Sequence, residues 1–194
     1  FDDEVIPTDM YDECIIDRDE GPRVPDLEKI KSLSPAFMEN GTITAATSSP
    51  VSIGASAILI TSRTYAEKNS IQIKAAIKGR SLVGVDWRRM GMGPLPATEN
   101  VLKSLEMTMN DIDVIELNEA FSAQALYVIK KGGWDASKIN LNGGAIALGH
   151  PLGCSGARII TTLLSVMEQK NSRTGLATMC IGTGQGIATI LARE

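Results

Sequence analysis

"DIDVIELNEAFSAQALYVIKK", residues 111–131, is the stretch that best indicates the fold class. Its segment Val114–Leu117 is short and begins with β-branched residues, which is typical of a strand. A helical pattern follows directly, from about Ala120 to Lys131. A strand, a loop and a helix in immediate succession indicate a layered α/β fold.

The rest of the chain continues this alternation. The opening forty residues are acidic and rich in proline, so we expect them to be extended or looped. Residues 54–60 are apolar enough for a buried helix or strand, and their length does not decide between the two. The patterns predict helices at 26–31, 97–107 and 157–168, and strands at 71–85, with an interruption at Gly79, at 176–180 and at 187–191.

Bulk properties exclude several classes of protein. The 194 residues are 43% hydrophobic and carry 19 basic and 23 acidic side chains, with no basic block of the kind that binds nucleic acid. No apolar run approaches the roughly 20 residues of a membrane span. The three cysteines lack the spacing of a metal site or a disulfide framework, so we expect no metal and a reducing compartment.

Three polar side chains follow predicted strands or occupy glycine-rich turns, where ligands bind in α/β sheets: Asn118, His150 and Cys180. His150 is the only histidine, and it can act as a general base, as an oxyanion donor, or only as a hydrogen-bonded turn residue. Cys180 in "MCIGTGQG" can be an acid or base, or a small buried apolar residue. "NEAF" can be a helix cap or a ligand-orienting pair.

Segments of this chain resemble, in order, the C-terminal half of thiolases: "NGTITAATSS", "MGMGPLPA", "NEAFSAQAL", "NGGAIALGHPLGCSGARI" and "GLATMCIGTGQG". The resemblance is strongest to degradative 3-ketoacyl-CoA thiolases of fatty-acid β-oxidation, acyltransferases that use coenzyme A to cleave a 3-ketoacyl-CoA into acetyl-CoA and a shortened acyl-CoA. It implies a thiolase-like layered α/β domain with a mixed five-stranded sheet covered by helices. Residues 1–40 would then be a lead-in and residues 41–194 the C-terminal domain.

The resemblance also implies a role for each matching residue. His150 would activate the nucleophilic thiol and, with a water held by Asn118, bind the thioester oxygen. Cys180 would be the acid and base at the acetyl-CoA carbon, and the Gly182 backbone N–H would contribute to a second oxyanion hole. The positions that match the lining of the coenzyme A and acyl tunnel are Ser49, Met90 and Phe121.

The chain departs from the family pattern in two ways. The nucleophilic cysteine of thiolases belongs to the N-terminal half, and none of Cys14, Cys154 and Cys180 lies in its motif. We therefore expect a fragment that lacks the N-terminal half and is inactive alone. In "SSPVSIGAS", Ile53 stands where thiolases usually have Asp, which puts local packing in question.

The resemblance leaves several alternatives open. A biosynthetic acetoacetyl-CoA thiolase and a non-catalytic domain that binds acyl-CoA or a partner share these motifs. Coenzyme A is expected as a co-substrate and no bound cofactor is expected. The parent enzyme would be a homodimer or tetramer, with a β-oxidation multienzyme partner, and would be cytoplasmic in a bacterium or mitochondrial or peroxisomal in a eukaryote.

Overall fold

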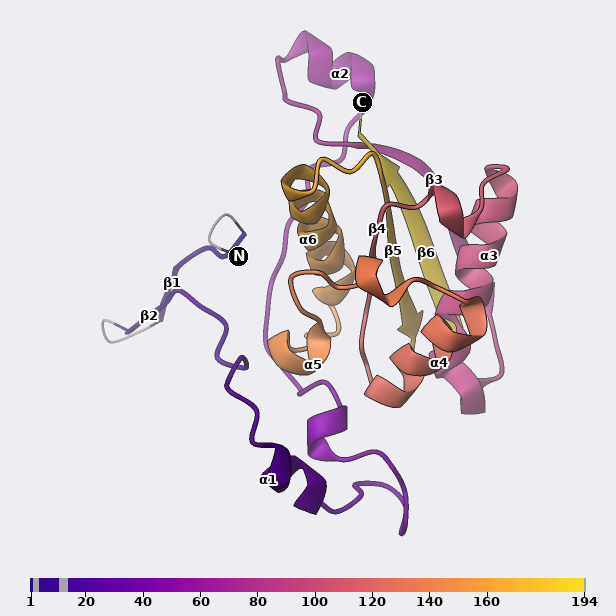
Figure 1. The fold of residues 1–194 in the computed structure, drawn as a ribbon. Helices are drawn as coiled ribbons and strands as arrows, with labels where there is room; N and C mark the ends of the chain where they lie inside the picture. The colour runs from indigo at the N-terminus through magenta and orange to yellow at the C-terminus, as the bar shows by residue number, and fades with distance from the viewer. Residues whose placement is uncertain (2–3, 11–13, 194) are drawn as a thin grey trace.

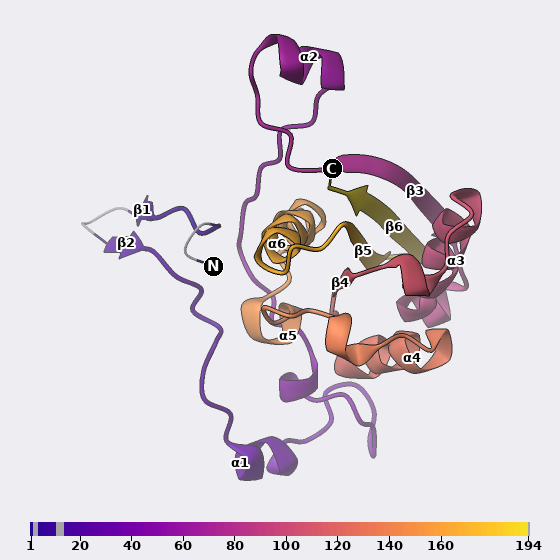
Figure 2. The same cartoon turned by 45° about the horizontal axis from the view of Figure 1, so that its top comes forward.

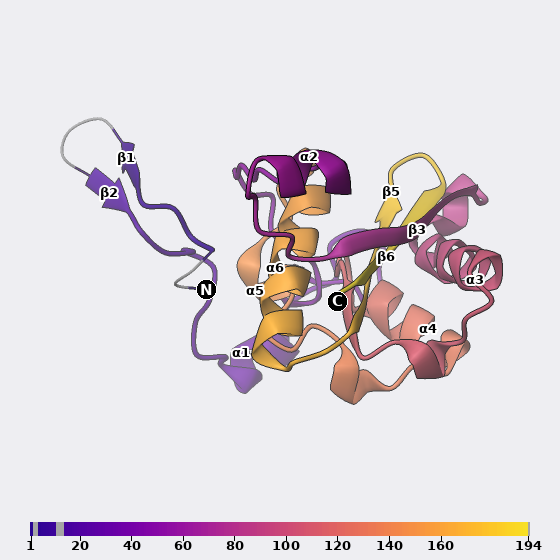
Figure 3. The same ribbon diagram turned by 90° about the horizontal axis from the view of Figure 1, so that it is seen from above.

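A four-stranded mixed sheet forms the centre of the computed structural model, which describes residues 1, 4–10 and 14–193. The strand order is β3-β6-β5-β4, and only the β4–β5 pairing is parallel among the strands described (Figure 1). A separate antiparallel pair, β1 and β2, lies apart from this sheet (Figure 3). The strands are β1 Thr8–Met10, β2 Cys14–Ile16, β3 Ala76–Gly84, β4 Val114–Leu117, β5 Thr174–Ile181 and β6 Gln185–Ala192.

Helices cover both faces of the sheet. α3 and α4 lie on one face and α6 on the other, so the domain has three layers (Figure 2). The helices are α1 Leu27–Ser32, α2 Arg63–Lys68, α3 Pro94–Ser104, α4 Ser122–Gly132, α5 Ala145–Leu148 and α6 Ser155–Gln169, with 3₁₀ turns η1 Ala45–Thr47, η2 Trp87–Met92, η3 Met109–Asp111 and η4 Ala136–Lys138. The predicted layered α/β fold is confirmed.

The unit formed by β4 and α4 follows the prediction closely. β4 occupies the predicted residues, and all four of its residues are buried. α4 begins at Ser122 and ends before Gly133, which has φ +64° and closes the helix in the left-handed conformation that glycine tolerates. Lys130 and Lys131 in the last turn complement the negative end of the helix dipole.

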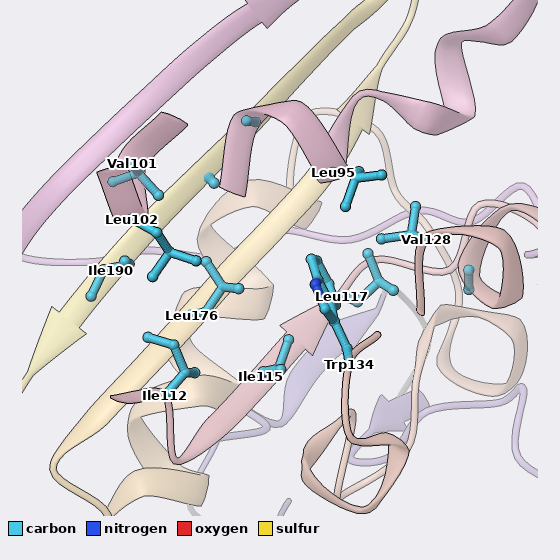
Figure 4. Close-up of a cluster of buried hydrophobic side chains, with 13 residues drawn as sticks. Leu95, Val101, Leu102, Ile112, Ile115, Leu117, Val128, Trp134, Leu176 and Ile190 are labelled. Atoms are coloured by element: carbon cyan, nitrogen blue, oxygen red, sulfur yellow. The ribbon is translucent and has the colours of Figure 1, made fainter. Parts of the chain in front are cut away.

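The face covered by α3 and α4 holds the larger apolar cluster (Figure 4). Alternate residues of β4, Ile115 and Leu117, point into it, together with Leu176 of β5 and Ile190 of β6. α3 begins at Pro94, three residues before the predicted start, because proline at the first helical position loses no hydrogen bond. Its buried cluster members are Leu95, Ala97, Val101 and Leu102.

α6 covers the opposite face with a single buried stripe. Its buried positions recur at intervals of three and four residues, as expected for an amphipathic helix packed on a sheet. The apolar members pack against Val114 of β4, Ala177 of β5 and Leu191 of β6. The buried residues of α6 are Ser155, Ile159, Thr162, Leu163, Val166 and Met167.

The sequence predicted an interruption of the first long strand at Gly79, and the structure confirms it. The register of β3 against β6 shifts between Ile77 and Gly79, which marks a β-bulge. A side chain at Gly79 would contact Leu105 and Val101 closely, so glycine allows α3 to approach the strand at the bulge.

Two expectations about strands need correction. Residues 54–60 form neither a buried helix nor a strand: they are extended, and Leu59 and Ile60 are exposed. Ser56 holds this segment to the start of α6, because its hydroxyl donates to the Cys154 carbonyl over 2.9 Å. The described sheet also has four strands rather than five, since the segment beside β4 pairs only through an Ile115–Ile139 bridge before Asn140 turns away at φ +49°.

We expect Leu176→Ala to lower the free energy of unfolding by about 2–5 kcal/mol, because Leu176 is fully buried between α3 and the sheet. Urea denaturation monitored by circular dichroism measures this change. Leu82→Ala is the control, since Leu82 on β3 is 64% exposed, and we expect a change below about 0.5 kcal/mol. Equal losses in the two variants would show that the face under α3 is not the main core.

Candidate active site

The parallel pairing of β4 with β5 brings two of the predicted site residues to the same end of the sheet. Asn118 follows β4 directly, and its backbone N–H donates to the carbonyl of Thr178 over 3.0 Å. Cys180 lies two residues beyond Thr178 on β5, and Gly182 is the first residue after that strand. Carboxyl ends of adjacent parallel strands are the usual position of a site in α/β sheets.

Asn118 contacts His150 rather than capping a helix. The Asn118 Nδ2 lies 3.4 Å from the His150 Nε2, and the Asn118 side chain is only 1% exposed. α4 has Phe121 as its N-cap residue, with no side-chain cap. The helix-cap interpretation of "NEAF" is therefore wrong for Asn118, and the amide is free to orient the histidine.

Gly149 sets the backbone path that brings His150 to this place. It ends α5 with φ +106° and ψ 164°, a conformation that is essentially restricted to glycine. A Cβ at this position would also clash with the Ser52 side chain. The turn can therefore pass close to the 50–56 segment only because residue 149 has no side chain.

Glu119 and Asn140 hold the loop after β4 in place, and sequence reasoning assigned neither of them this role. The Asn140 Nδ2 donates to the Leu117 carbonyl and to the Glu119 carboxylate, both over 2.9 Å. The same carboxylate accepts the Ile146 N–H over 3.2 Å at the start of α5. Glu119 thus ties the Asn118 loop to the helix that leads into His150.

Ser155 is a second neighbour of His150 that the sequence did not reveal. Its Oγ lies 2.6 Å from the His150 Nδ1, while the other ring nitrogen faces Asn118. Ser155 is fully buried in the first turn of α6. Its position five residues after the histidine in "GHPLGCS" is the only signal in the sequence, and it becomes informative once the turn is known.

A buried carboxyl group and a partly buried guanidinium lie beneath the turn. Glu116 on β4 is 2% exposed, and its Oε2 lies 3.9 Å from Nη1 of Arg158 on α6. Burial raises the pKa of Glu116 to about 8, although the charge of Arg158 acts in the opposite direction. Glu116 is therefore predominantly protonated at neutral pH, and it leaves the positive charge of Arg158 largely unbalanced.

Burial moves the pKa values of the two catalytic candidates in opposite directions. Desolvation lowers the pKa of His150, and the nearby Arg158 charge lowers it further. Desolvation raises the pKa of the Cys180 thiol, which is 4% exposed. At pH 7 the imidazole is thus available as a base and the thiol keeps its proton.

The three predicted tunnel positions lie around the same loop. Ser49 donates from both its N–H and its hydroxyl to the Ala120 carbonyl, over 3.0 and 3.1 Å. Phe121 packs edge-on against Phe37, with ring centroids 6.2 Å apart. Met90 lies in η2, which packs on α4 so closely that a side chain at Gly91 would contact Gln124. Ser49 and Phe37 thus border the loop after β4, and Met90 lies in the turn that packs on the helix after this loop.

The remaining features add no further ligand group. A cavity of about 520 Å³ lies behind the turn, lined by residues of the 52–57 segment, α6 and the opening segment, but not by Asn118, His150 or Cys180. Among the described residues no group of three His, Cys, Asp or Glu side chains is placed to hold a metal ion. No helix in the described part of the chain has the length and apolar character to cross a bilayer. The side chain of Cys14 lies outside the described residues.

Comparison with known families shows to which family the chain belongs. The family model for the thiolase C-terminal domain matches residues 71–193, and that for the thiolase N-terminal domain matches residues 1–64. The chain belongs to the thiolase family. The N-terminal match ends at residue 64 and the C-terminal match begins at residue 71. The division of the chain into a lead-in at 1–40 and a domain at 41–194 stays a prediction.

Curated relatives of this thiolase chain carry a common name. A "3-ketoacyl-CoA thiolase" of Vibrio vulnificus strain YJ016 is 52% identical over all of this chain and 52% of its own length. The protein of the same name from Acinetobacter baylyi is 50% identical over the same shares of both chains. The thiolase chain therefore spans about half the length of the curated relatives it matches.

Solved thiolase structures share the fold. The acetyl-CoA acetyltransferase of Bacillus anthracis superposes with a TM-score of 0.93 at 36% identity, over all of this chain and 50% of that one. Human mitochondrial 3-ketoacyl-CoA thiolase superposes with a TM-score of 0.89 at 35% identity, over 98% of this chain and 49% of that one. A further structure of the human enzyme is a complex with CoA.

We expect Gly149→Ala to destabilise this thiolase chain by about 1–3 kcal/mol, because alanine would be strained at φ +106° and would clash with Ser52. The shift of the urea midpoint measures the loss. Gly153→Ala is the matched control, because a side chain there would meet nothing within 4 Å, and we expect almost no change. Equal stability of the two variants would contradict the role given to Gly149.

A second prediction concerns Glu116 and pH. Its pKa is raised in the folded state, so the folded chain binds a proton that the unfolded chain has lost between about pH 4.5 and 8. The stability contributed by the protonated form is full below that range and is lost as pH rises through it. Glu116→Gln should remove this loss.

Denaturation between pH 7 and 8 tests that prediction, since His150 is mostly neutral in both states there and the Cys180 thiol is still protonated in the folded state. We expect wild-type stability to fall by roughly 1 kcal/mol per pH unit and that of Glu116→Gln to fall less. Glu99→Gln, on the exposed side of α3, is the control. The same slope in all three proteins would show that Glu116 is already ionised when folded.

Proposed function

We propose that this chain supplies the acid–base half of the active site of a 3-ketoacyl-CoA thiolase. The parent enzyme would be an acyltransferase that uses coenzyme A to cleave a 3-ketoacyl-CoA to acetyl-CoA and a shortened acyl-CoA in fatty-acid β-oxidation. The observation that carries the proposal is the contact between Asn118 and His150 at the sheet end where β5 presents Cys180. The relatives' names support the substrate class.

The reaction needs a nucleophile that attacks the ketone carbonyl of the substrate. We place that cysteine outside these 194 residues, because none of the cysteines in this sequence lies in its motif. His150 would remove the proton of this cysteine as it attacks. That proton would pass to the Cys180 thiolate that remains after Cys180 has protonated the acetyl-CoA product, and His150 would then deprotonate coenzyme A. A lowered pKa suits this role, since the imidazole is then unprotonated at neutral pH.

Cleavage of the bond between C2 and C3 leaves its electron pair on acetyl-CoA as an enolate. Cys180 would donate a proton to C2, and its raised pKa keeps the thiol protonated for that step. The enolate oxygen needs oriented dipoles, which we assign to His150 and a water held by Asn118. The Gly182 N–H would act in the same way on the acyl oxygen of the other half-reaction.

Binding and assembly are further parts of the proposal. Coenzyme A would enter along Ser49 and Phe121, which lie at the loop after β4, and Met90, which lies in the turn packed on α4. The parent would be a homodimer or tetramer and would work beside other β-oxidation enzymes. Its location would be the cytoplasm in a bacterium, or mitochondria or peroxisomes in a eukaryote. The names of the bacterial and human relatives support both settings.

A condensing acetoacetyl-CoA thiolase is the second candidate, favoured by the fit to the Bacillus anthracis acetyl-CoA acetyltransferase. A non-catalytic acyl-CoA binding domain is a third. Its main sequence hint, Ile53, lies on an exposed segment and lines the cavity behind the turn. The chain length of the substrate that is cleaved separates the first two candidates, and the absence of turnover would favour the third.

The test is thiolysis of acetoacetyl-CoA and of a long-chain 3-ketoacyl-CoA by the parent protein that contains this chain. We expect cleavage of the long-chain substrate, and losses of about 10²–10⁴-fold in kcat for His150→Ala and Cys180→Ala. Cys154→Ala is the matched control, because Cys154 is also buried but bonds to Ser56, and it should keep activity within about fivefold.

Each alternative result has a definite meaning. Cleavage of acetoacetyl-CoA alone would favour the condensing enzyme. An intact parent that cleaves neither substrate would overturn the proposal and favour the binding domain. Activity of the isolated 194-residue chain would contradict the placement of the nucleophile outside it.

A further inference from the structure

Both nitrogens of the His150 ring have a polar neighbour, and this restricts where the proton of the neutral ring lies. The Nδ1 is 2.6 Å from the Ser155 Oγ, and the Nε2 is 3.4 Å from the Asn118 Nδ2. A neutral imidazole carries one N–H and one lone pair, and the partners of the two nitrogens decide which is which. Ser155 and Asn118 are the two side chains that decide it here.

The hydroxyl of Ser155 has one proton to donate, and the structure gives that proton another acceptor. The Ser155 Oγ lies 3.0 Å from the carbonyl of Pro151, four residues earlier, which also accepts the Ser155 N–H over 2.9 Å. A serine hydroxyl bonded to the carbonyl four residues before it is a common arrangement in helices. With its proton so used, the oxygen can only accept from Nδ1.

The Asn118 side chain, on the other side of the ring, also favours a proton on Nδ1. Its Nδ2 is a donor and cannot accept a hydrogen bond, so a contact with Nε2 requires a lone pair on that nitrogen. Asn118 is held in place because the loop after β4 is tied by Asn140 and Glu119. Both contacts are therefore satisfied together when the proton is on Nδ1.

We propose that Ser155 is a positioning residue that fixes His150 as the Nδ1–H tautomer, in a chain of hydrogen bonds from Nδ1–H to Ser155 Oγ and from Ser155 O–H to the Pro151 carbonyl. The lone pair is then on Nε2, the nitrogen that faces Asn118. When His150 takes up a second proton, this chain needs no rearrangement, because Nδ1 already donates. The catalytic meaning of the tautomer rests on the proposed function, but the tautomer itself does not.

The competing arrangement is well defined. Ser155 could donate to Nδ1 instead, with the Asn118 amide reversed so that its Oδ1 accepts from an Nε2–H. That arrangement would occupy the Asn118 Oδ1, which is buried without a partner. It would, however, remove the Ser155 proton from the Pro151 carbonyl. The two arrangements differ in which ring nitrogen is protonated, and this is directly measurable.

Because His150 is the only histidine in the 194 residues, its nitrogen spectrum has no overlap. Two-bond ¹H–¹⁵N correlation spectra of the labelled chain at about pH 8 distinguish a protonated from an unprotonated ring nitrogen. We expect Nδ1 to appear protonated and Nε2 unprotonated. The opposite pattern in the wild-type chain would overturn the proposal, whatever the variants do.

Variants show whether Ser155 is the cause. In Ser155→Ala the Nδ1–H loses its acceptor, so the population of the Nε2–H tautomer should rise at least severalfold. Ser155→Thr keeps the hydroxyl and should restore the wild-type pattern, and Ser165→Ala on the same helix should leave it unchanged. An unchanged tautomer in a folded Ser155→Ala chain, judged by its dispersed amide spectrum, would overturn the proposal.

The nitrogen spectrum tests the role of Ser155 and the thiolysis assay tests the proposed function, so one proposal can be contradicted while the other stands. An inactive parent with the Nδ1–H tautomer would remove the proposed function and leave the role of Ser155 intact. An active parent whose His150 carries its proton on Nε2 would do the reverse.

Discussion

The parallel pairing of β4 with β5 is the constraint on which the rest of the site depends. It sets Leu117 opposite Thr178, so that the residues following β4 emerge beside the last residues of β5. Asn118 is bonded to that neighbouring strand through its backbone, and its side chain can therefore be buried at 1% exposure. The Gly149 turn and the bond between Glu119 and α5 then bring His150 to within 3.4 Å of the Asn118 amide. A slip of one residue in this register would turn Asn118 to the other face of the sheet.

Beneath this register lies an unusual pair, the buried carboxyl group of Glu116 and the partly buried guanidinium of Arg158. Glu116 and Arg158 are 3.9 Å apart, farther than a good ion pair, and each has an atom that is buried without a hydrogen-bond partner. Such an arrangement contributes little to stability, because the free-energy cost of removing each group from water exceeds the electrostatic attraction to a distant partner. Its effect on the site is electrostatic. With Glu116 protonated, Arg158 acts on His150 as a nearly unopposed positive charge.

The sequence predicted the fold well wherever local signals and tertiary packing agree. The bounds of β4 and an interruption at Gly79 were predicted at the residue level, and the interruption is a bulge in the structure. In both places the local residue pattern favours the same conformation as the packing around it. Residues 54–60 were misjudged because apolar composition predicts burial but does not specify what would cover the side chains. The number of strands was overestimated for a related reason. The segment at Ile139 pairs with β4 through a single residue, which is too short to produce an alternating pattern in the sequence.

The site was predictable only in part, for a different reason. Asn118, His150 and Cys180 stood out because chemistry-bearing residues at strand ends and glycine-rich turns are uncommon. Their supporting residues did not, because Glu119, Asn140 and Ser155 are ordinary polar residues until the backbone brings them within hydrogen-bond distance. Only Gly149 carried a signal of its own, since a glycine beside a histidine marks a special backbone path without showing where it leads.

One environment can serve both an acid and a base because desolvation penalises charge of either sign. Around His150 it disfavours the cation, so the imidazole remains a base, and around Cys180 it disfavours the anion, so the thiol remains an acid. No dedicated charged partner is needed for the thiol, and Arg158 only reinforces the effect on the imidazole. Pairs of groups whose pKa values are moved in opposite directions are typical of acid–base sites. The apolar packing of the sheet end therefore sets the protonation states from which a carbon–carbon cleavage at neutral pH would begin.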